Sequence, residues 1–279
     1  MKLKTLLLSG VFALLSVTCI WGQSSINIGV RGGLTIPNLT AIGKTTELNK
    51  DYATTTRFGA GIFAEFKLSP LFSIQPMLEY SEQGAKKNGL QALLTPDELA
   101  PILAPSATYL YANYKSNAKL NYLMLPVLAK FGWNLSHTSP FRVYVDAGPF
   151  VGLLVSAKQV ISGGDSPAYS DAKGTVPAMI YAIDPTTQQP VLNPVTGEPM
   201  IVPLPALPFD RTENIKDQLH QFSFGFEGNV GLQYQIKRNI IFIEGGGNYG
   251  LLNIQKMTKV IGKNNCGAGT VMVGYAYAL

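Results

Sequence analysis

The feature that most constrains this chain is a two-residue alternation of apolar and polar side chains. It is clearest between Gln221 and Ile236, where the large apolar residues fall on one side and the polar residues on the other. A β-strand points successive side chains to opposite faces, so the segment predicts a strand with one apolar face. The apolar side carries Phe222, Phe224, Phe226, Val230, Leu232, Tyr234 and Ile236, and the polar side carries Gln221, Ser223, Glu227, Asn229, Gln233 and Gln235.

The same alternation recurs along the chain, and it predicts eight strands of about 10–16 residues each. The fourth, 120–131, is apolar on both sides and contains Pro126; we include it because a set of hairpins needs it. Ordinary globular strands average roughly five or six residues, whereas a tilted strand needs about 9–11 to cross a bilayer. The length therefore favours a membrane barrel over a soluble sandwich. The other strands are expected over 26–34, 57–67, 72–81, 141–153, 221–236, 241–251 and 271–279.

The connections alternate between short and long. Short links follow the second, fourth and sixth strands, and long links follow the others, as in outer-membrane barrels with short periplasmic turns and long extracellular loops. This pattern places both ends of the mature chain in the periplasm. The long links are expected at 37–55, 84–116, 158–219 and 253–266.

Two of the long links carry local signals of their own. The 158–219 link holds nine of the eighteen prolines, from Pro167 to Pro208. Proline lacks the N–H that a strand ladder needs, so we expect an irregular extracellular loop or a small cap. Within the 84–116 link, the stretch Pro96–Ala107 is expected to form one short helix.

Together these observations predict an all-β fold, an eight-stranded antiparallel transmembrane β-barrel. A closed barrel leaves no backbone hydrogen-bonding group unpaired in the hydrocarbon. Its apolar face then contacts lipid, and aromatic residues near strand ends lie at the membrane interfaces. Those aromatic residues are Tyr80, Trp133, Phe141, Tyr234, Tyr249 and Tyr277.

The polar face points into the barrel and carries five positive and five negative side chains. An unpaired buried charge is costly, so we interpret this balanced set as a structural network of ion pairs. Eight strands enclose a lumen only just wide enough for side chains, which favours a packed polar plug over a conducting pore. The predicted network comprises Arg31, Arg57, Glu65, Lys67, Glu79, Lys130, Arg142, Asp146, Glu227 and Glu244.

The N-terminus has the layout of a secretory signal peptide, with Lys2 and Lys4 before an apolar run that ends near Trp21. We place cleavage near residue 22, which leaves 23–279 as a single barrel domain in the outer membrane. Cys19 raises a lipoprotein alternative, but the preceding residues form a poor lipobox. Removal of the signal lowers the net charge from +5 to +3; with no basic run, a nucleic-acid partner is unsupported.

After the signal, Cys266 is the one cysteine, and the sequence contains no metal-binding or cofactor motif. We therefore expect no intramolecular disulfide, no metal and no cofactor. The expected partners are outer-membrane lipid, the barrel assembly machinery through the C-terminal strand, and other envelope or secretion proteins.

Four stretches, in order along the chain, carry a family resemblance: Ile28–Leu34 with Asn38 and Leu39, Phe72–Lys86, Tyr122–Pro126 and Tyr144–Leu153. They resemble the PorT-type outer-membrane β-barrel family of Bacteroidetes. The resemblance implies an eight-stranded outer-membrane barrel without a general active site, and its namesake assists type IX secretion. The long proline-rich link and the terminal Leu279, where outer-membrane proteins commonly end in Phe, depart from this pattern.

The leading functional hypothesis is a non-enzymatic structural or binding barrel, either an accessory to protein secretion or a binder that uses its outer loops. A narrow channel or transporter is the alternative. A second alternative is a rim hydrolase or acyltransferase that uses His220 with an acid such as Asp210 or Asp217. No residue spacing demands this enzyme, so no catalytic residue is predicted.

Overall fold

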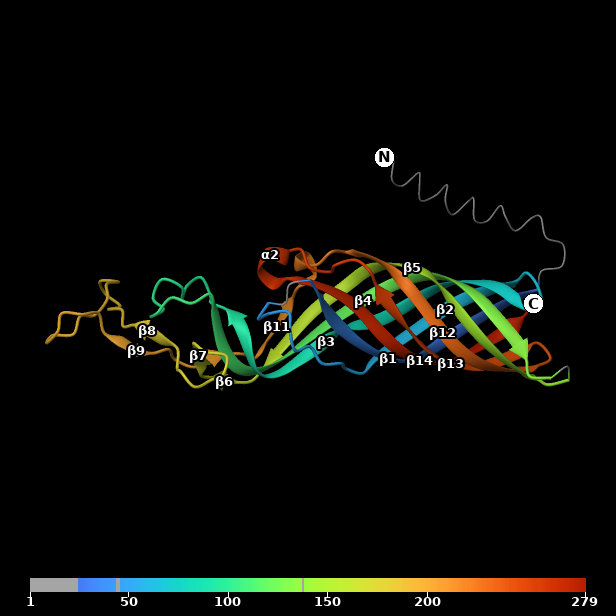
Figure 1. Cartoon of the computed structure of the whole chain (residues 1–279), viewed down its shortest axis with the longest axis horizontal. Coiled ribbons are helices and arrows are strands. Elements are labelled where there is room, and N and C mark those ends of the chain that lie inside the picture. Colours follow the sequence, from blue (N-terminus) through green and yellow to red (C-terminus); the bar gives the residue numbers. More distant parts are fainter. Residues whose placement is uncertain (1–24, 44–45, 137) are drawn as a thin grey trace, which may run out of the picture.

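The computed structural model describes residues 25–43, 46–136 and 138–279, so the expected signal peptide lies outside the described residues. Eight long strands pair antiparallel in chain order, and the last pairs with the first to close a ring (Figure 1). The predicted eight-stranded barrel is confirmed. Its strands are β1 (Ile26–Ile42), β2 (Arg57–Lys67), β3 (Phe72–Leu94), β4 (Tyr109–Asn134), β5 (Phe141–Ser162), β12 (Phe222–Ile236), β13 (Asn239–Gly250) and β14 (Lys263–Ala278).

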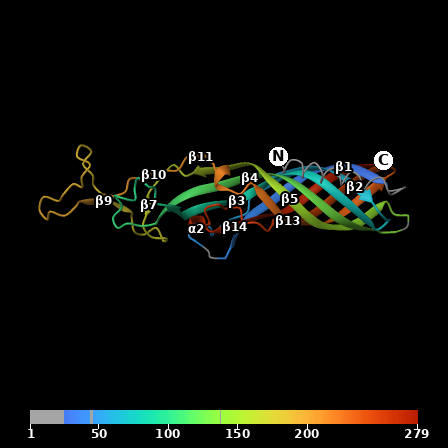
Figure 2. The same ribbon diagram turned by 90° about the horizontal axis from the view of Figure 1, so that it is seen from above.

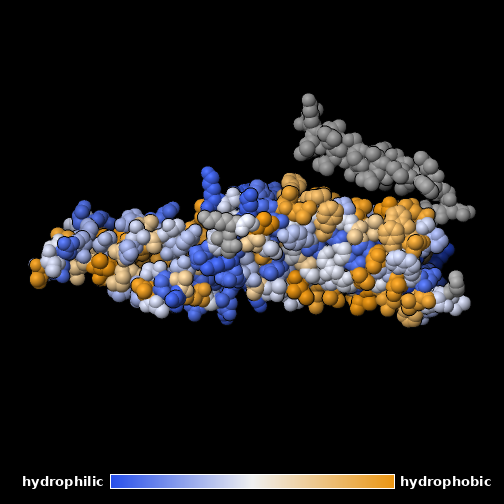
Figure 3. All heavy atoms as spheres, viewed as in Figure 1, coloured by the Kyte–Doolittle hydropathy of each residue, from blue (hydrophilic) through white to orange (hydrophobic). Residues whose placement is uncertain are grey.

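The outer surface of the ring carries a continuous apolar belt. Phe222 and Val230 of β12 expose 65% and 64% of their surface, whereas Met272 and Leu128, which face the lumen, expose none. The belt covers the half of the molecule near the C-terminus (Figure 3). Such large exposed apolar patches are atypical of soluble proteins. In an outer-membrane barrel, an apolar belt of this kind contacts the lipid hydrocarbon. In the part of the chain that the structure describes, no helix is apolar and long enough to cross a membrane.

The two ends of the barrel differ. At the short-turn end, strands are joined by residues 68–71, 135–140 and 237–238. At the long-loop end, they are joined by residues 43–56, 95–108, 163–221 and 251–262, and the last of these contains the four-residue helix α2 (Thr258–Ile261). The start of β1 and the end of β14 both lie at the short-turn end, because Ile26 pairs with Phe66 before the 68–71 turn and Tyr277 pairs with Asn239 after the 237–238 turn.

Strands β3, β4 and β5 continue beyond the belt as a protruding sheet, visible in both views (Figures 1 and 2). Much of the expected 84–116 loop is therefore β-hairpin, paired up to Leu94 opposite Tyr109. Long-range packing explains the difference, because Leu110, Ala112 and Tyr114 on one face of β4 contact apolar residues of the 163–221 segment. These contacts come from residues more than 50 positions away.

The 163–221 segment is more ordered than expected. It forms short strands that pair with one another or extend the main sheet, and the 3-10 turn η2 (Lys216–Gln218) follows them. Prolines sit at the ends of these short pairings, where a missing N–H costs least. The strands are β6 (Asp165–Ser166), β7 (Ala168–Tyr169), β8 (Met179–Tyr181), β9 (Ile201–Pro203), β10 (Leu207–Pro208) and β11 (Arg211–Asn214).

The prediction of a helix over Pro96–Ala107 is wrong, because the segment forms turns. The backbone N–H groups of Leu99 and Ala100 donate to the carbonyl of Pro96, which makes a single turn. Pro101 and Pro105 then follow, and neither can supply the N–H that a continuing helix requires.

The fourth strand is present despite Pro126. Both of its faces are apolar because one contacts lipid and the other points into the lumen. The inward side chains are Leu120, Tyr122, Met124 and Leu128. Strand pairing is interrupted beside Pro126 and beside the prolines of the neighbouring strands, Pro76 and Pro149.

Candidate functional site

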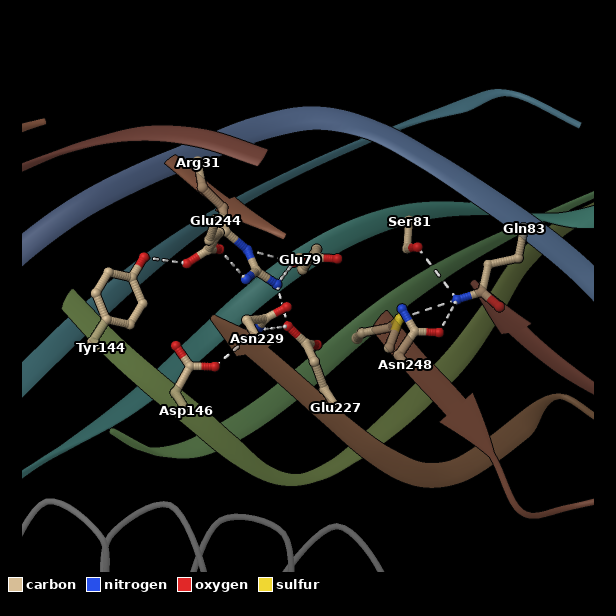
Figure 4. A network of polar contacts seen from close by, with 11 residues as sticks. Arg31, Glu79, Ser81, Gln83, Tyr144, Asp146, Glu227, Asn229, Glu244 and Asn248 are labelled. Carbon is tan, nitrogen blue, oxygen red and sulfur yellow. Dashed lines mark hydrogen bonds and ion pairs between the residues drawn. The ribbon is translucent and has the colours of Figure 1, made fainter. Parts of the chain in front are cut away.

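A charged cluster fills the centre of the lumen (Figure 4). The guanidinium of Arg31, on β1, contacts three carboxylates from three other strands: Glu79 on β3, Glu227 on β12 and Glu244 on β13. The Arg31 Nη1–Glu244 Oε1 and Arg31 Nη2–Glu227 Oε1 distances are both 2.6 Å, and Arg31 Nε donates to Glu79 Oε2 at 2.9 Å. The fork of N–H groups on one arginine therefore ties four strands together.

Neutral donors extend this cluster across the barrel. The Tyr144 hydroxyl donates to Glu244 Oε2 at 2.6 Å. Asn229 Nδ2 donates to Asp146 Oδ1 at 2.9 Å and to Glu227 Oε1 at 3.1 Å. The cluster thus spans the lumen from β1 to β5.

A second polar group lies nearer the short-turn end. Glu65 accepts hydrogen bonds from Asn27 and Ser73, and its Oε2 lies 3.7 Å from Lys130 Nζ. Lys130 Nζ also lies 4.0 Å from the centre of the Tyr144 ring, a cation–π contact that joins the two groups. Between this group and the central cluster, the lumen is filled by buried apolar side chains, among them Phe63, Leu128 and Phe242, which pack with Tyr144.

Aromatic rings pack beside glycines directly opposite them on neighbouring strands. Phe63 faces Gly29, Tyr144 faces Gly231, and Phe242 faces Gly274. A Cβ at any of these glycines would overlap the ring that faces it. The glycines thus make room for three inward rings in a lumen with little spare space.

The ten side chains of the predicted network occupy three levels. Seven of them are buried in or beside the two polar groups: Arg31, Glu65, Glu79, Lys130, Asp146, Glu227 and Glu244. Arg57 is half-buried toward the long-loop end, where its Nη2 donates to Asn117 Oδ1. Lys67 and Arg142 are half-buried toward the short-turn end, where Arg142 donates to the carbonyl of Pro70.

The distribution of charge among these levels is uneven. The seven buried residues comprise two cations and five carboxyl groups. Sequence phase indicated which side chains point inward, but only the structure shows that three carboxylates share one arginine. Despite this excess of carboxylates, the described residues include no cluster suited to a metal ion.

Apolar side chains close the lumen above the central cluster, toward the long loops. Ile215 and Leu219 of the 163–221 segment and Ile254 of the β13–β14 connection pack against Leu120 and Leu154 inside the barrel. We call Ile215, Leu219 and Ile254 the loop seal. Between the loop seal and the central cluster, the side chains leave a cavity of only about 10 Å³, which is about the smallest that holds one water.

Hydrogen bonds join the two segments that supply the loop seal. The backbone N–H of His220 donates to the carbonyl of Ile254 at 2.9 Å, and the N–H of Lys256 donates to the carbonyl of Gln218 at 3.1 Å. The His220 side chain is exposed, and within the described residues it makes no hydrogen bond to Asp210 or Asp217. Asp210 instead accepts from the N–H groups of Gly163 and Gly164. The acid–histidine pair that a rim enzyme needs is not assembled here.

A cavity of about 360 Å³ lies beyond the loop seal, within the range of about 300–1,000 Å³ that small-molecule sites occupy. The loop seal, together with Leu39, Ala85 and Leu120, gives it an apolar side. The rest of the lining is mixed, with further apolar residues such as Leu48, Leu93 and Ile161 beside polar ones. The polar residues are Tyr52, Lys87, Gln91, Tyr114, Ser116, Gln159, Arg211 and Glu213. None of these residues was predicted as a site from the sequence, because most of them fall in the expected loops and no motif marks them.

Lys87 is the lining residue with the most distinctive surroundings. It lies on β3 between Lys86 and Asn88, whose exposed polar side chains place this part of the strand beyond the apolar belt. Its Nζ donates to the carbonyl of Leu48 at 2.7 Å and lies 4.6 Å from the centre of the Tyr52 ring. Burial lowers the pKa of Lys87 to about 8. Burial also raises the pKa of Tyr52 to about 12, so this phenol stays neutral.

A closed antiparallel ring of eight strands with an apolar outer belt defines an outer-membrane β-barrel protein. The sequence matches the family described as outer membrane protein beta-barrel domain over residues 21–256, which is most of the chain. The chain belongs to this family and is a protein of the outer membrane.

Solved outer-membrane barrels are similar to this chain at low sequence identity. Ail of Yersinia pestis, solved with the heparin analogue sucrose octasulfate, is 9% identical; the match covers 92% of this chain and 100% of Ail, with a TM-score of 0.33. Neisserial surface protein A is 10% identical over 90% of this chain and 97% of that protein, with a TM-score of 0.35. OprG of Pseudomonas aeruginosa is 11% identical; the match covers 92% of this chain and 98% of OprG, with a TM-score of 0.33. No curated protein gave a significant match to the sequence.

Proposed function

We propose that this protein is a non-enzymatic binding barrel that does not conduct and whose long-loop end carries the binding surface. The observation that carries the proposal is that the lumen is filled along its length. The polar groups around Arg31 and Lys130 occupy the centre, and the loop seal closes the lumen above them. The parts available for binding are then the long loops, the protruding sheet and the cavity between them.

The proposal includes an orientation, with the short-turn end in the periplasm and the long loops outside the cell. It is supported by the start of β1 and the end of β14, which both lie at the short-turn end, and by the usual loop asymmetry of such barrels. Protease added to intact cells is expected to cut within 163–221. A cut confined to 135–140 would show that the orientation is inverted.

An accessory role in protein secretion, the finer reading suggested by the PorT-type resemblance, is one version of this proposal. In that version the protruding sheet and the 163–221 segment contact another envelope protein. Crosslinking in the outer membrane tests it: a partner that is lost when 182–200 is shortened supports the secretion version, and crosslinks only to lipid would contradict it.

Single-channel recording tests the proposal against the channel alternative. Purified protein, shown to be folded by its heat-modifiable migration on a gel, is reconstituted into planar bilayers. We expect no stepwise currents from the wild type. Reproducible unitary currents from folded protein would overturn the proposal and favour a narrow channel.

A further inference from the structure

We propose that the cavity beyond the loop seal binds a small amphipathic molecule with a carboxylate head, with Lys87 as the head-group contact. The inference deepens the proposed function and rests on it, because the loop seal forms part of the cavity wall. It names the class of ligand and the residue that recognises it.

The cavity is lined by both apolar and polar side chains. Leu39, Leu120 and Ile254 are among the apolar ones, and each is at least 95% buried in the same cluster. An aliphatic or aromatic tail placed against them would leave water, which is the main driving force for binding apolar groups. Polar groups for the head of such a molecule are supplied by Lys87 and Ser116, which lie directly opposite each other on β3 and β4.

Lys87 is equipped to bind an anion. An ammonium group has three N–H donors, and the structure assigns one of them to the carbonyl of Leu48. The other cation in the wall, Arg211, lies 2.5 Å from Glu213 and is already neutralised by it. Lys87 is therefore the lining cation whose charge is not matched by an acid in the cavity wall.

The charged groups near Lys87 lie outside the cavity wall, and Asp51 and Glu47 are the acids among them that act on its charge. Glu47 forms an ion pair with Lys50 at 2.8 Å and also accepts from Tyr111. Asp51, Lys86 and Lys115 are exposed. Tyr52 and Tyr114 face the cavity as neutral phenols, because burial raises the pKa of each to about 12.

Calorimetric titration tests the assignment. The full-length barrel in lipid nanodiscs is titrated with octanoate, and empty nanodiscs supply the reference for partition into lipid. We expect saturable binding of octanoate to the wild type and weaker binding of 1-octanol. Lys87→Met should weaken octanoate binding roughly ten- to a hundredfold, the effect of losing one charge-assisted hydrogen bond, and leave 1-octanol unchanged.

Lys86→Met is the matched control, because it removes the adjacent charge from an exposed, outward position and should leave octanoate binding unchanged. Ala118→Trp fills the cavity from β4 and should abolish binding of both ligands. Heat-modifiable migration shows that each variant is folded.

The pH profile gives a second readout. Because the pKa of Lys87 is lowered to about 8, the ammonium is lost as the pH rises through that value. Octanoate binding to the wild type should therefore weaken between about pH 7 and pH 9, while 1-octanol binding stays flat.

Two results would overturn this inference. If the wild-type protein takes up no more octanoate than empty nanodiscs, the cavity is not a binding site. If octanoate binds the wild type and Lys87→Met equally well, Lys87 is not the head-group contact. Either result leaves the proposed non-conducting barrel standing, because that proposal fails on unitary currents.

Discussion

At the residue scale, Arg31 holds the centre of the lumen. It supplies the positive charge for three carboxylates that come from β3, β12 and β13. The two-residue alternation placed Arg31 and these carboxylates on the inward face, because the phase of a strand fixes which side chains share a face. It could not show which of them meet, because their contacts depend on how the strands are staggered around the ring. The cavity residues escaped prediction for a similar reason, since Lys87 and Tyr52 meet only through the folded long loops.

Replacement of Arg31 tests this role. Arg31→Met leaves three buried carboxylates without their cation, and loss of one partner from a buried ion pair typically costs about 3–5 kcal/mol. We expect a fall of this size in the free energy of unfolding, measured by urea titration and followed by the fluorescence of Trp133. Arg31→Lys should recover only part of it, because an ammonium cannot form the arginine fork.

Arg57 provides the comparison for this measurement. It is half-buried, and its partners are the neutral Asn117 side chain and the carbonyl of Ala118. Arg57→Met should therefore cost only about 1 kcal/mol. An Arg31→Met variant as stable as the wild type would contradict the central role of Arg31.

At the element scale, the strands form where the apolar–polar alternation predicts them, but several are longer than the alternating segments. The apolar belt accounts for the membrane-crossing parts, and these were predictable because lipid imposes a simple pattern on every strand. The extensions of β3, β4 and β5 were not predictable, because their inner faces pack against Ala168, Leu204 and Phe209 of a distant segment. Sequence pattern alone carries no information about that pairing.

The fit between β13 and β14 depends on a glycine opposite an aromatic ring. Gly274 faces Phe242, and a Cβ at this position would overlap the ring. Gly274→Ala should lower the free energy of unfolding by about 1–3 kcal/mol, the usual cost of overpacking. Gly245→Ala is the matched variant on β13, because its Cβ would meet only the carbonyl oxygen of Thr270, at 3.9 Å. Equal stability of the two variants in urea titration would contradict this packing.

At the scale of the whole molecule, the outer-membrane barrel has a filled interior and a folded long-loop end. From the short-turn end inward, the lumen holds the Glu65–Lys130 group, an apolar cluster with the rings of Phe63, Tyr144 and Phe242, the Arg31 cluster and the loop seal. A solute would have to displace all of them to pass. The β3–β5 extension and the short strands β6–β10 of the 163–221 segment protrude from one end of the molecule (Figure 1), away from the half that carries the apolar belt (Figure 3). This division supports the assignment of binding to the long-loop end.

Cys266 offers a direct measurement of whether the lumen is closed. Its thiol donates to Gln83 Oε1 between the loop seal and the central cluster, and the residue is 4% exposed. The chain, with Cys19 replaced by serine, is treated in lipid nanodiscs with a water-soluble maleimide, and labelling is measured by mass spectrometry. A closed lumen predicts negligible labelling of folded protein and complete labelling after heat denaturation, whereas labelling of the folded barrel as fast as the denatured chain would contradict it.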